Sequence, residues 1–158
     1  MRVVLQRVTR ASVSVGDEIV GAIGPGLLMF VGIAQGDDAA QARRTAQKCA
    51  ALRLFPDEAG RFDRSLVEEA GEALVVSQFT LLADVRSGRR PSFIAAAAPV
   101  VAEPLVTAFA EELQRIGVRV AGGRFGAMMH VESVNDGPVT VIVDSDDLDR
   151  PRHLHAGR

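Results

Sequence analysis

Two short segments combine polar side chains with a constrained backbone and could carry chemistry. In the first, Ser77-Gln78-Phe79-Thr80, two hydroxyls and an amide directly follow the apolar run Ala73-Leu74-Val75-Val76. In the second, Asn135-Asp136-Gly137-Pro138-Val139-Thr140, a turn-forming sequence lies between apolar residues. A hydroxyl can act as a nucleophile, and backbone amides can stabilise a developing negative charge. Each segment alone also has a structural explanation, because strand hydroxyls satisfy hydrogen bonds and Asn-Asp-Gly-Pro forms hairpin turns.

Other common chemistries lack the residues that they need. A metal site requires clustered ligands, but His153 and His155 lie near the C-terminus and His130 stands alone in an alternating segment. We therefore expect no metal and no cofactor. A Ser-His-Asp triad would have to recruit His130, and Ser77 lacks the flanking glycines of a nucleophile elbow.

The first third of the chain predicts strands that would position these segments. Short turns separate the apolar alternations, which favours antiparallel pairing. A helix should follow over residues 38–54, because Asp38 and Gln41 resemble a capping box and small apolar residues then recur at helical spacing. The expected strands cover residues 2–8, 12–15, 18–23 and 27–33.

The second half predicts a buried strand at residues 73–76, which leads into Ser77, and a second helix with Pro104 near its first turn and Gly117 at its end. Further strands are expected at residues 118–121, 128–134 and 139–144. The fold class is therefore α+β, a mainly antiparallel, barrel-like sheet with two covering helices. One domain should span residues 1–145, and the polar tail 146–158 should fray.

Composition agrees with one soluble domain and a reducing cytoplasm. The 158 residues are 47% hydrophobic and 24% charged, and the single cysteine, Cys49, cannot form an internal disulfide. The longest apolar run, residues 26–34, is far shorter than the roughly 20 residues that span a bilayer. Because the net charge is -2, contacts with RNA would need local clusters such as Arg86, Arg89 and Arg90. Solvated surface charge is the alternative interpretation of that cluster.

Taken together, the motifs resemble those of the D-aminoacyl-tRNA deacylase family along residues 1–144. The resemblance implies hydrolysis of the ester that joins a D-amino acid to the terminal adenosine ribose of tRNA. Glycyl-tRNA should also be cleaved, and L-aminoacyl groups should be excluded. The matching stretches are Leu5-Gln6-Arg7-Val8-Thr9-Arg10-Ala11-Ser12-Val13, Val75-Val76-Ser77-Gln78-Phe79-Thr80-Leu81, Arg90-Pro91-Ser92-Phe93, Gly123-Arg124-Phe125 and Val134-Asn135-Asp136-Gly137-Pro138-Val139-Thr140.

The resemblance also implies roles for particular residues and a homodimer. Catalysis would rest on Gln78, Phe79 and Thr80, with backbone amides around Phe79 and Thr80 binding the oxyanion. A cis Gly137-Pro138 bond would enter the partner's site, where its carbonyls would clamp the α-amino group. The remaining substrate-binding residues would be Ser77, Arg7 and Met129, the last two near the Gly137-Pro138 loop.

Thr80 and the rim of the site are the open points of this interpretation. No adjacent base activates the Thr80 hydroxyl, so we favour attack by water assisted by the ribose 2′-hydroxyl. The chain departs from the usual family pattern at Phe62-Asp63, Gly122, Met128 and His130. Two other functions remain open, a non-catalytic barrel that binds RNA or protein and a peptidase or small-ester hydrolase using Thr80 or Ser77.

Overall fold

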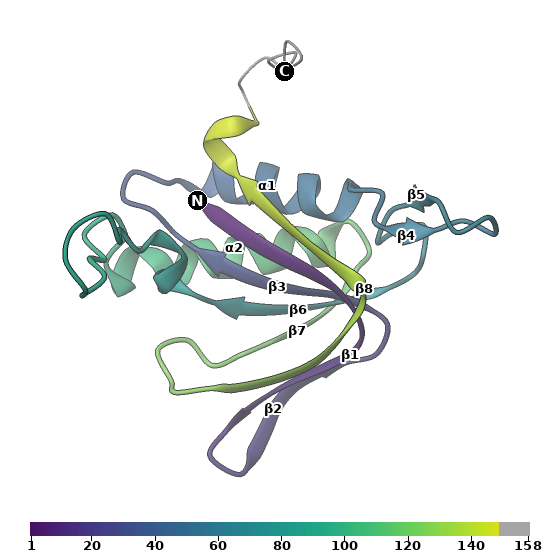
Figure 1. The fold of residues 1–158 in the computed structure, drawn as a ribbon, viewed down its shortest axis with the longest axis horizontal. Coiled ribbons are helices and arrows are strands. Elements are labelled where there is room, and N and C mark those ends of the chain that lie inside the picture. Colours follow the sequence, from purple (N-terminus) through teal and green to yellow (C-terminus); the bar gives the residue numbers. More distant parts are fainter. Residues whose placement is uncertain (149–158) are drawn as a thin grey trace.

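The structure is a computed structural model that describes residues 1–148. It has a curved sheet, two helices on one face of that sheet and a small separate hairpin (Figure 1). Its elements are β1 (Arg2–Val15), β2 (Glu18–Ile23), β3 (Gly26–Gly32), α1 (Ala39–Ala51), β4 (Phe55–Pro56), β5 (Phe62–Arg64), β6 (Glu72–Ser77), the 3-10 helix η1 (Phe79–Leu82), α2 (Pro99–Arg115), β7 (Arg119–Gly122), β8 (His130–Asp144) and the 3-10 helix η2 (Ser145–Asp147).

The long strand β1 organises the sheet. β8 pairs with β1 along one edge, and β3 and then β2 pair with it along the other, all antiparallel. This confirms the antiparallel pairing expected from the short turns. β6 lies parallel to β3, and β7 lies parallel to β6. These two pairs are parallel because α1 and α2 lie in the connections that lead to them, which lets the chain return in the same direction.

The sheet curls until β2 approaches β7, which makes it barrel-like. A Cβ atom on Gly21 would lie 2.5 Å from the carbonyl oxygen of Gly122, so only glycine permits this approach. Arg124 and Glu18 add an ion pair of 3.1 Å across the same gap. The predicted α+β class, with a barrel-like sheet and two covering helices, is therefore confirmed.

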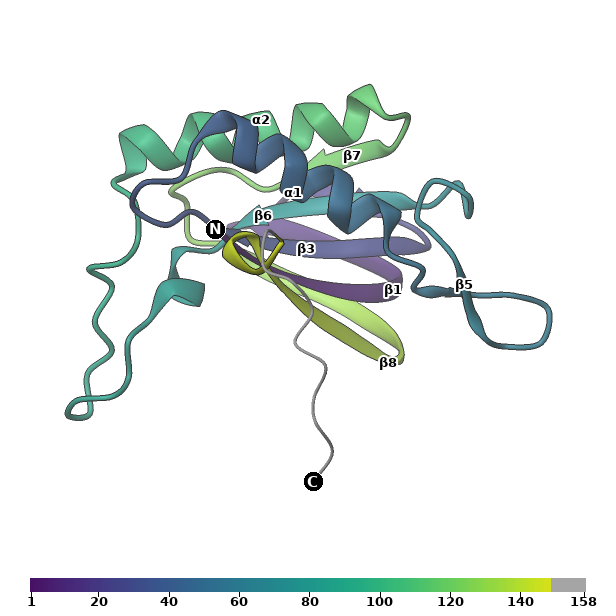
Figure 2. The ribbon, with the colours of Figure 1, turned by 90° about the horizontal axis from the view of Figure 1, so that it is seen from above.

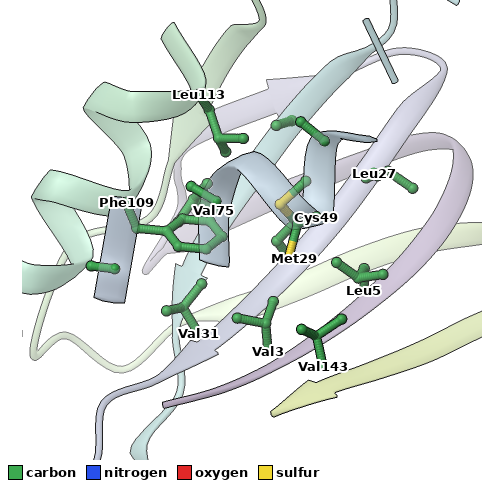
Figure 3. Packing of buried hydrophobic residues seen from close by; sticks show 14 of the residues in the cluster. Val3, Leu5, Leu27, Met29, Val31, Cys49, Val75, Phe109, Leu113 and Val143 are labelled. Atoms are coloured by element: carbon green, nitrogen blue, oxygen red, sulfur yellow. The ribbon is translucent and has the colours of Figure 1, made fainter. Parts of the chain in front are cut away.

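Alternate residues of the strands supply the two sides of the sheet. Met29 and Val75 face the helices and pack with Phe109 of α2, whereas Leu28 and Leu74 belong to a cluster on the other side. Cys49 of α1 lies inside the helix-facing cluster, as Figure 3 shows. Burial raises the pKa of the Cys49 thiol to about 12, so this residue packs as a small hydrophobe.

Several predicted boundaries were wrong. The strands expected at 2–8 and 12–15 form the single strand β1, and those at 128–134 and 139–144 form most of β8. The register of the β1–β8 pairing shifts on both sides of Val8, and these bulges let both strands continue without a break. Helix α2 begins at Pro99, so Pro104 lies inside it. Pro99 suits the first helical position, where its missing N–H would have no partner.

The residues on either side of the predicted domain boundary at 145 pack against the body of the protein. Ser145 is fully buried, its amide donates to the carbonyl of Met1, and it begins η2. Leu148 packs against the main core. Residues 146–148 therefore belong to the packed domain, and the rest of the predicted tail lies outside the described residues.

Candidate active site

A cavity of about 390 Å³ opens where β6 ends, between η1 and the start of α2. Its walls are mostly apolar, and polar groups enter only from Ser77 and Gln78. A cavity of this size and character fits a small organic group. The lining residues are Val31, Ile33, Ser77, Gln78, Phe79, Phe93, Ala96, Ala97, Pro99, Ala102, Val106, Phe125 and Gly126.

Unpaired backbone amides lie beside this cavity. The Gln78 amide donates to the carbonyl of Val31 at 2.8 Å, which fixes the end of β6. Phe79 and Thr80 then open η1, where the first amides of a helix have no intrahelical acceptor. Neither amide donates a hydrogen bond to any other residue in the range 1–148. Two donors are therefore free to bind an incoming oxygen.

The Thr80 side chain has a partner, but that partner is not a base. The Gln78 side-chain amide donates to the Thr80 hydroxyl oxygen, and no carboxylate or imidazole of the described residues bonds it. An amide cannot accept a proton near neutral pH. The geometry thus brings Gln78 and Thr80 together without an activated nucleophile.

Phe79 and Phe93 form the mouth of the cavity. Their ring centroids lie 5.1 Å apart with an interplanar angle of 72°, an edge-to-face contact. Phe79 is 57% exposed, so its ring offers a large apolar surface to a ligand. Phe93 was recognised only as part of a motif, because the contact joins two loops that no periodic pattern connects.

The Gly137-Pro138 loop is held by a network of hydrogen bonds inside β8. The peptide bond between these residues is cis. Asn135 reaches around the loop, accepting from the amide of Val139 at 2.7 Å and donating to its carbonyl at 3.2 Å. Gly137 has φ of +145°, and a Cβ atom there would lie 2.7 Å from the Val139 amide nitrogen. The loop therefore requires glycine for its own conformation.

Arg7 joins the loop to the β4–β5 hairpin. It is 8% exposed, and its guanidinium donates to the carbonyl of Asp136 at 3.0 Å and to the carbonyl of Leu54 at 2.6 Å. The same group lies 5.6 Å from the ring centroid of Phe62, a cation–π contact. The structure thus places Arg7 beside the loop, as expected, and adds Phe62, which the sequence analysis named only as a departure from the family pattern.

Met129 does not lie beside this loop. It immediately precedes β8 and lies six residues before Asn135, which pairs with Val8, and its sulfur covers Gly123. Its side chain is half-buried against the cluster that contains Val13. Within one chain the loop lies midway along β8, whereas Met129 lies just before its first residue.

The two candidate segments lie far apart within one chain. Ser77 pairs with Val31, which in turn pairs with Val3 of β1. Gly137-Pro138 lies instead beside Arg7 of β1, between the pairs Gln6–Thr140 and Val8–Asn135. Four residues along β1 correspond to roughly 13 Å, and the three strand spacings between β6 and β8 correspond to roughly 14 Å. In Figure 1 the arrowhead of β6 accordingly points to the left, whereas the bend of β8 lies at the right.

Residues 1–148 contain neither a cluster of metal ligands nor a membrane-spanning helix. No three histidine, cysteine or acidic residues gather in a way that could hold a metal ion. Within the same residues, no helix has both the length and the apolar character needed to cross a membrane.

Comparison with known proteins places this geometry in context. The model of the family described as D-Tyr-tRNA(Tyr) deacylase matches residues 4–144. A D-aminoacyl-tRNA deacylase of Roseiflexus sp. (strain RS-1) is 63% identical over 155 residues, which cover 98% of this chain and 100% of that protein. A solved structure titled c-Myc DNA Unwinding Element Binding Protein is 40% identical with a TM-score of 0.85, covering 91% of this chain and 98% of that chain. A structure titled as that of a probable eukaryotic D-amino acid tRNA deacylase shares the fold, with 19% identity, a TM-score of 0.80 and coverages of 90% and 97%.

Proposed function

The chain belongs to the D-Tyr-tRNA(Tyr) deacylase family, and we propose that it hydrolyses the ester of D-aminoacyl-tRNA, releasing the free D-amino acid and tRNA. The observation that carries this proposal is the pair of unpaired amides, Phe79 and Thr80, at the edge of an apolar cavity. Since aminoacyl-tRNA is an intermediate of translation, we place the activity in the cytoplasm.

The amides of Phe79 and Thr80 would stabilise the tetrahedral intermediate. A water oxygen attacks the ester carbonyl carbon, and the carbonyl oxygen gains negative charge, which the two N–H groups bind. The ester C–O bond then breaks, and the ribose oxygen takes the proton that the water releases. The ribose 2′-hydroxyl passes this proton, because within residues 1–148 the Thr80 hydroxyl bonds only the Gln78 amide, which is not a base.

Chirality would be selected by the Gly137-Pro138 loop through exclusion. Its two carbonyls would hold the α-amino group and the Cα hydrogen, leaving no volume for an L side chain. A D side chain would point outward, and glycine would pass because it has no side chain to reject. The hydrogen bonds from Arg7 and Asn135 support this role, since a selector must keep its shape.

A homodimer would bring the two segments together. Within one chain β3 and β1 separate the strand β6, which leads to the cavity, from the strand β8, which carries the loop, so we propose that the loop of one subunit enters the cavity of the other. Ile142, in the β8 segment that follows the loop, is 63% exposed on the side of the sheet away from the helices. A partner subunit would cover this apolar surface.

A nucleic-acid-binding module without catalysis is the second candidate, because one similar structure is titled as a DNA-element-binding protein. Single-turnover assays of the purified protein with D-aminoacyl-tRNA, the matching L-aminoacyl-tRNA and glycyl-tRNA distinguish the two candidates. Our proposal predicts cleavage of the D-aminoacyl and glycyl esters only. Equal cleavage of both enantiomers would refute exclusion by the loop, and binding of tRNA without cleavage would favour the second candidate.

A further inference from the structure

Residues 84–92, which we name the arginine hairpin, project from the body of the protein. Asp84 and Ser92 pair through two backbone hydrogen bonds of 2.8 and 2.9 Å at its base. Gly88 has φ of +69° in its turn. Figure 2 shows this loop as the teal segment that extends furthest to the lower left, and Figure 1 shows the same projection from another side. It makes no helix or long strand, so its role is not to support the core.

The charges of this hairpin are of two kinds. Arg86 pairs with Asp84 at 2.7 Å, and the amide of Arg86 also donates to the same carboxylate, so this pair orders the turn. Hydrogen bonds from Arg86 hold the pKa of Asp84 at about 2. Arg89 and Arg90 are exposed, and neither has an ion pair or hydrogen bond with any residue in the described range. The hairpin thus presents two cations that no residue among 1–148 neutralises.

Arg89 and Arg90 lack a carboxylate partner, whereas most other surface arginines in the described part of the chain have one. Seven of the others pair with carboxylates: Arg2, Arg53, Arg61, Arg64, Arg115, Arg119 and Arg124. An arginine that is already paired with a carboxylate attracts an approaching anion only weakly, because the carboxylate offsets its charge. Arg89 and Arg90 keep their full charge and their planar donors for a bidentate anionic partner.

The hairpin also lies at the entrance of the cavity. Ser92 closes its base, and the next residue, Phe93, contacts Phe79 across the mouth. A ligand whose terminal adenosine occupies this mouth carries its remaining nucleotides outward, with one phosphate between each pair. These phosphates would pass beside the hairpin.

We propose that the arginine hairpin is a phosphate-binding arm, in which Arg89 and Arg90 bind backbone phosphates of the single-stranded 3′ end of tRNA. This proposal rests on the proposed function for the identity of the substrate. The contacts are electrostatic and independent of base sequence, so they add affinity for many tRNAs without selecting among them.

The test compares two double variants that each remove two positive charges. Arg89→Ala/Arg90→Ala alters the arm, and Arg43→Ala/Lys48→Ala alters two exposed residues of α1, a helix that contributes no residue to the lining of the cavity. Three measurements are made on the full-length protein: equilibrium binding of uncharged tRNA, the KM for D-aminoacyl-tRNA, and cleavage of the minimal ester D-aminoacyl-adenosine, which has no phosphate.

The arm variant should bind tRNA about tenfold more weakly and show a KM about tenfold higher. The negative slope of log affinity against log salt concentration should become shallower by about 1.4, because two phosphate contacts on a single strand are lost. Cleavage of the minimal ester and all properties of the control variant should not change. Unchanged tRNA binding by the arm variant, or an equal loss on the minimal ester, would overturn the proposal. Failure of the parent protein to cleave either ester would refute the proposed function, while the binding measurement would still decide the role of the arm.

Discussion

The cavity beside Ser77–Thr80 and the loop around Gly137-Pro138 are built in opposite ways. The cavity is lined by apolar side chains, and the amides of Phe79 and Thr80 beside it are unpaired within the described residues. In the loop, Arg7 and Asn135 bind the backbone on both sides of Gly137-Pro138.

The difference matches two separate tasks. A site that stabilises charge in a reaction needs donors that are free until the substrate arrives. A site that rejects one enantiomer needs atoms that do not move, because a small displacement would admit the wrong side chain. Changes to the cavity should therefore abolish cleavage, whereas changes to the loop should reduce chiral selection.

The largest effect should come from filling the cavity. Val106 is half-buried on α2 and lines the cavity, so Val106→Trp should occupy the substrate volume and lower single-turnover cleavage by at least about 100-fold. Val100→Trp, at an 81% exposed position of the same helix, is the control and should retain activity. Circular dichroism checks that both fold. Full activity of folded Val106→Trp would exclude this cavity as the site.

Removing the side chain that holds the loop should have the next largest effect. Arg7→Ala leaves two carbonyls, those of Asp136 and Leu54, without their donor, which should cost about 2–4 kcal/mol of folding free energy. The ratio of D- to L-ester cleavage should fall about tenfold or more. Urea unfolding and paired kinetic assays measure the two effects.

Two further variants provide a scale for the losses of stability and selectivity in Arg7→Ala. Phe62→Ala removes only the cation–π contact and should cost about 0.5–1 kcal/mol, with a smaller loss of selectivity in the same direction. Arg10→Ala, on an exposed position of β1, should change neither quantity. If Arg7→Ala loses stability but keeps full selectivity, the loop is structural only.

Thr80→Ala should have a small effect on cleavage. In the described part of the chain its hydroxyl bonds only the Gln78 amide, so we expect a loss of less than about tenfold in single-turnover cleavage. Thr80→Ser should be closer to the parent. A near-complete loss in Thr80→Ala with tRNA binding intact would identify the hydroxyl as the nucleophile.

The smallest effect on cleavage at neutral pH should come from changing Glu112, which lies near the C-terminal end of α2, beyond its cavity-lining residues Ala102 and Val106. Hydrogen bonds from Arg115 and then Gln47 lower the pKa of Glu112 to about 2. A carboxyl whose folded pKa is depressed stabilises the fold above its unfolded pKa of about 4.3, and this stability is lost as pH falls toward about 2. Urea titrations from pH 6 to 2 should show a smaller decline for Glu112→Gln than for the parent. Equal declines would exclude this pair as a source of acid sensitivity.

The sequence could predict the fold class and both candidate segments, because each depends on local patterns and on motifs. The cap at Asp38 was confirmed by its hydrogen bond to the Gln41 amide, which is a purely local interaction. The parallel pairing of β6 with β3 and β7 was less accessible, since it depends on where two helices return the chain.

The contacts that complete the site could not be predicted because they join distant parts of the chain. Arg7 reaches Leu54 and Asp136 across separations of 47 and 129 residues, and Phe93 meets Phe79 through loops without periodicity. One signal did point to such a residue: Phe62 departs from the family pattern, and it contacts Arg7. The merging of two predicted strands into β8 likewise depends on bulges that pair with β1, not on local sequence.

The central claim is that one subunit supplies the cavity and its partner supplies the loop, and mixed dimers of two variants test it most directly. Arg7→Ala loosens the loop but leaves the cavity open, whereas Val106→Trp blocks the cavity but leaves the loop intact. When Arg7→Ala is unfolded and refolded with an excess of Val106→Trp, almost every Arg7→Ala subunit should join a Val106→Trp subunit, so that its open cavity receives an intact loop. We predict that the ratio of D- to L-ester cleavage then returns to the parental value. A ratio that stays at the low value of the Arg7→Ala homodimer contradicts a shared site.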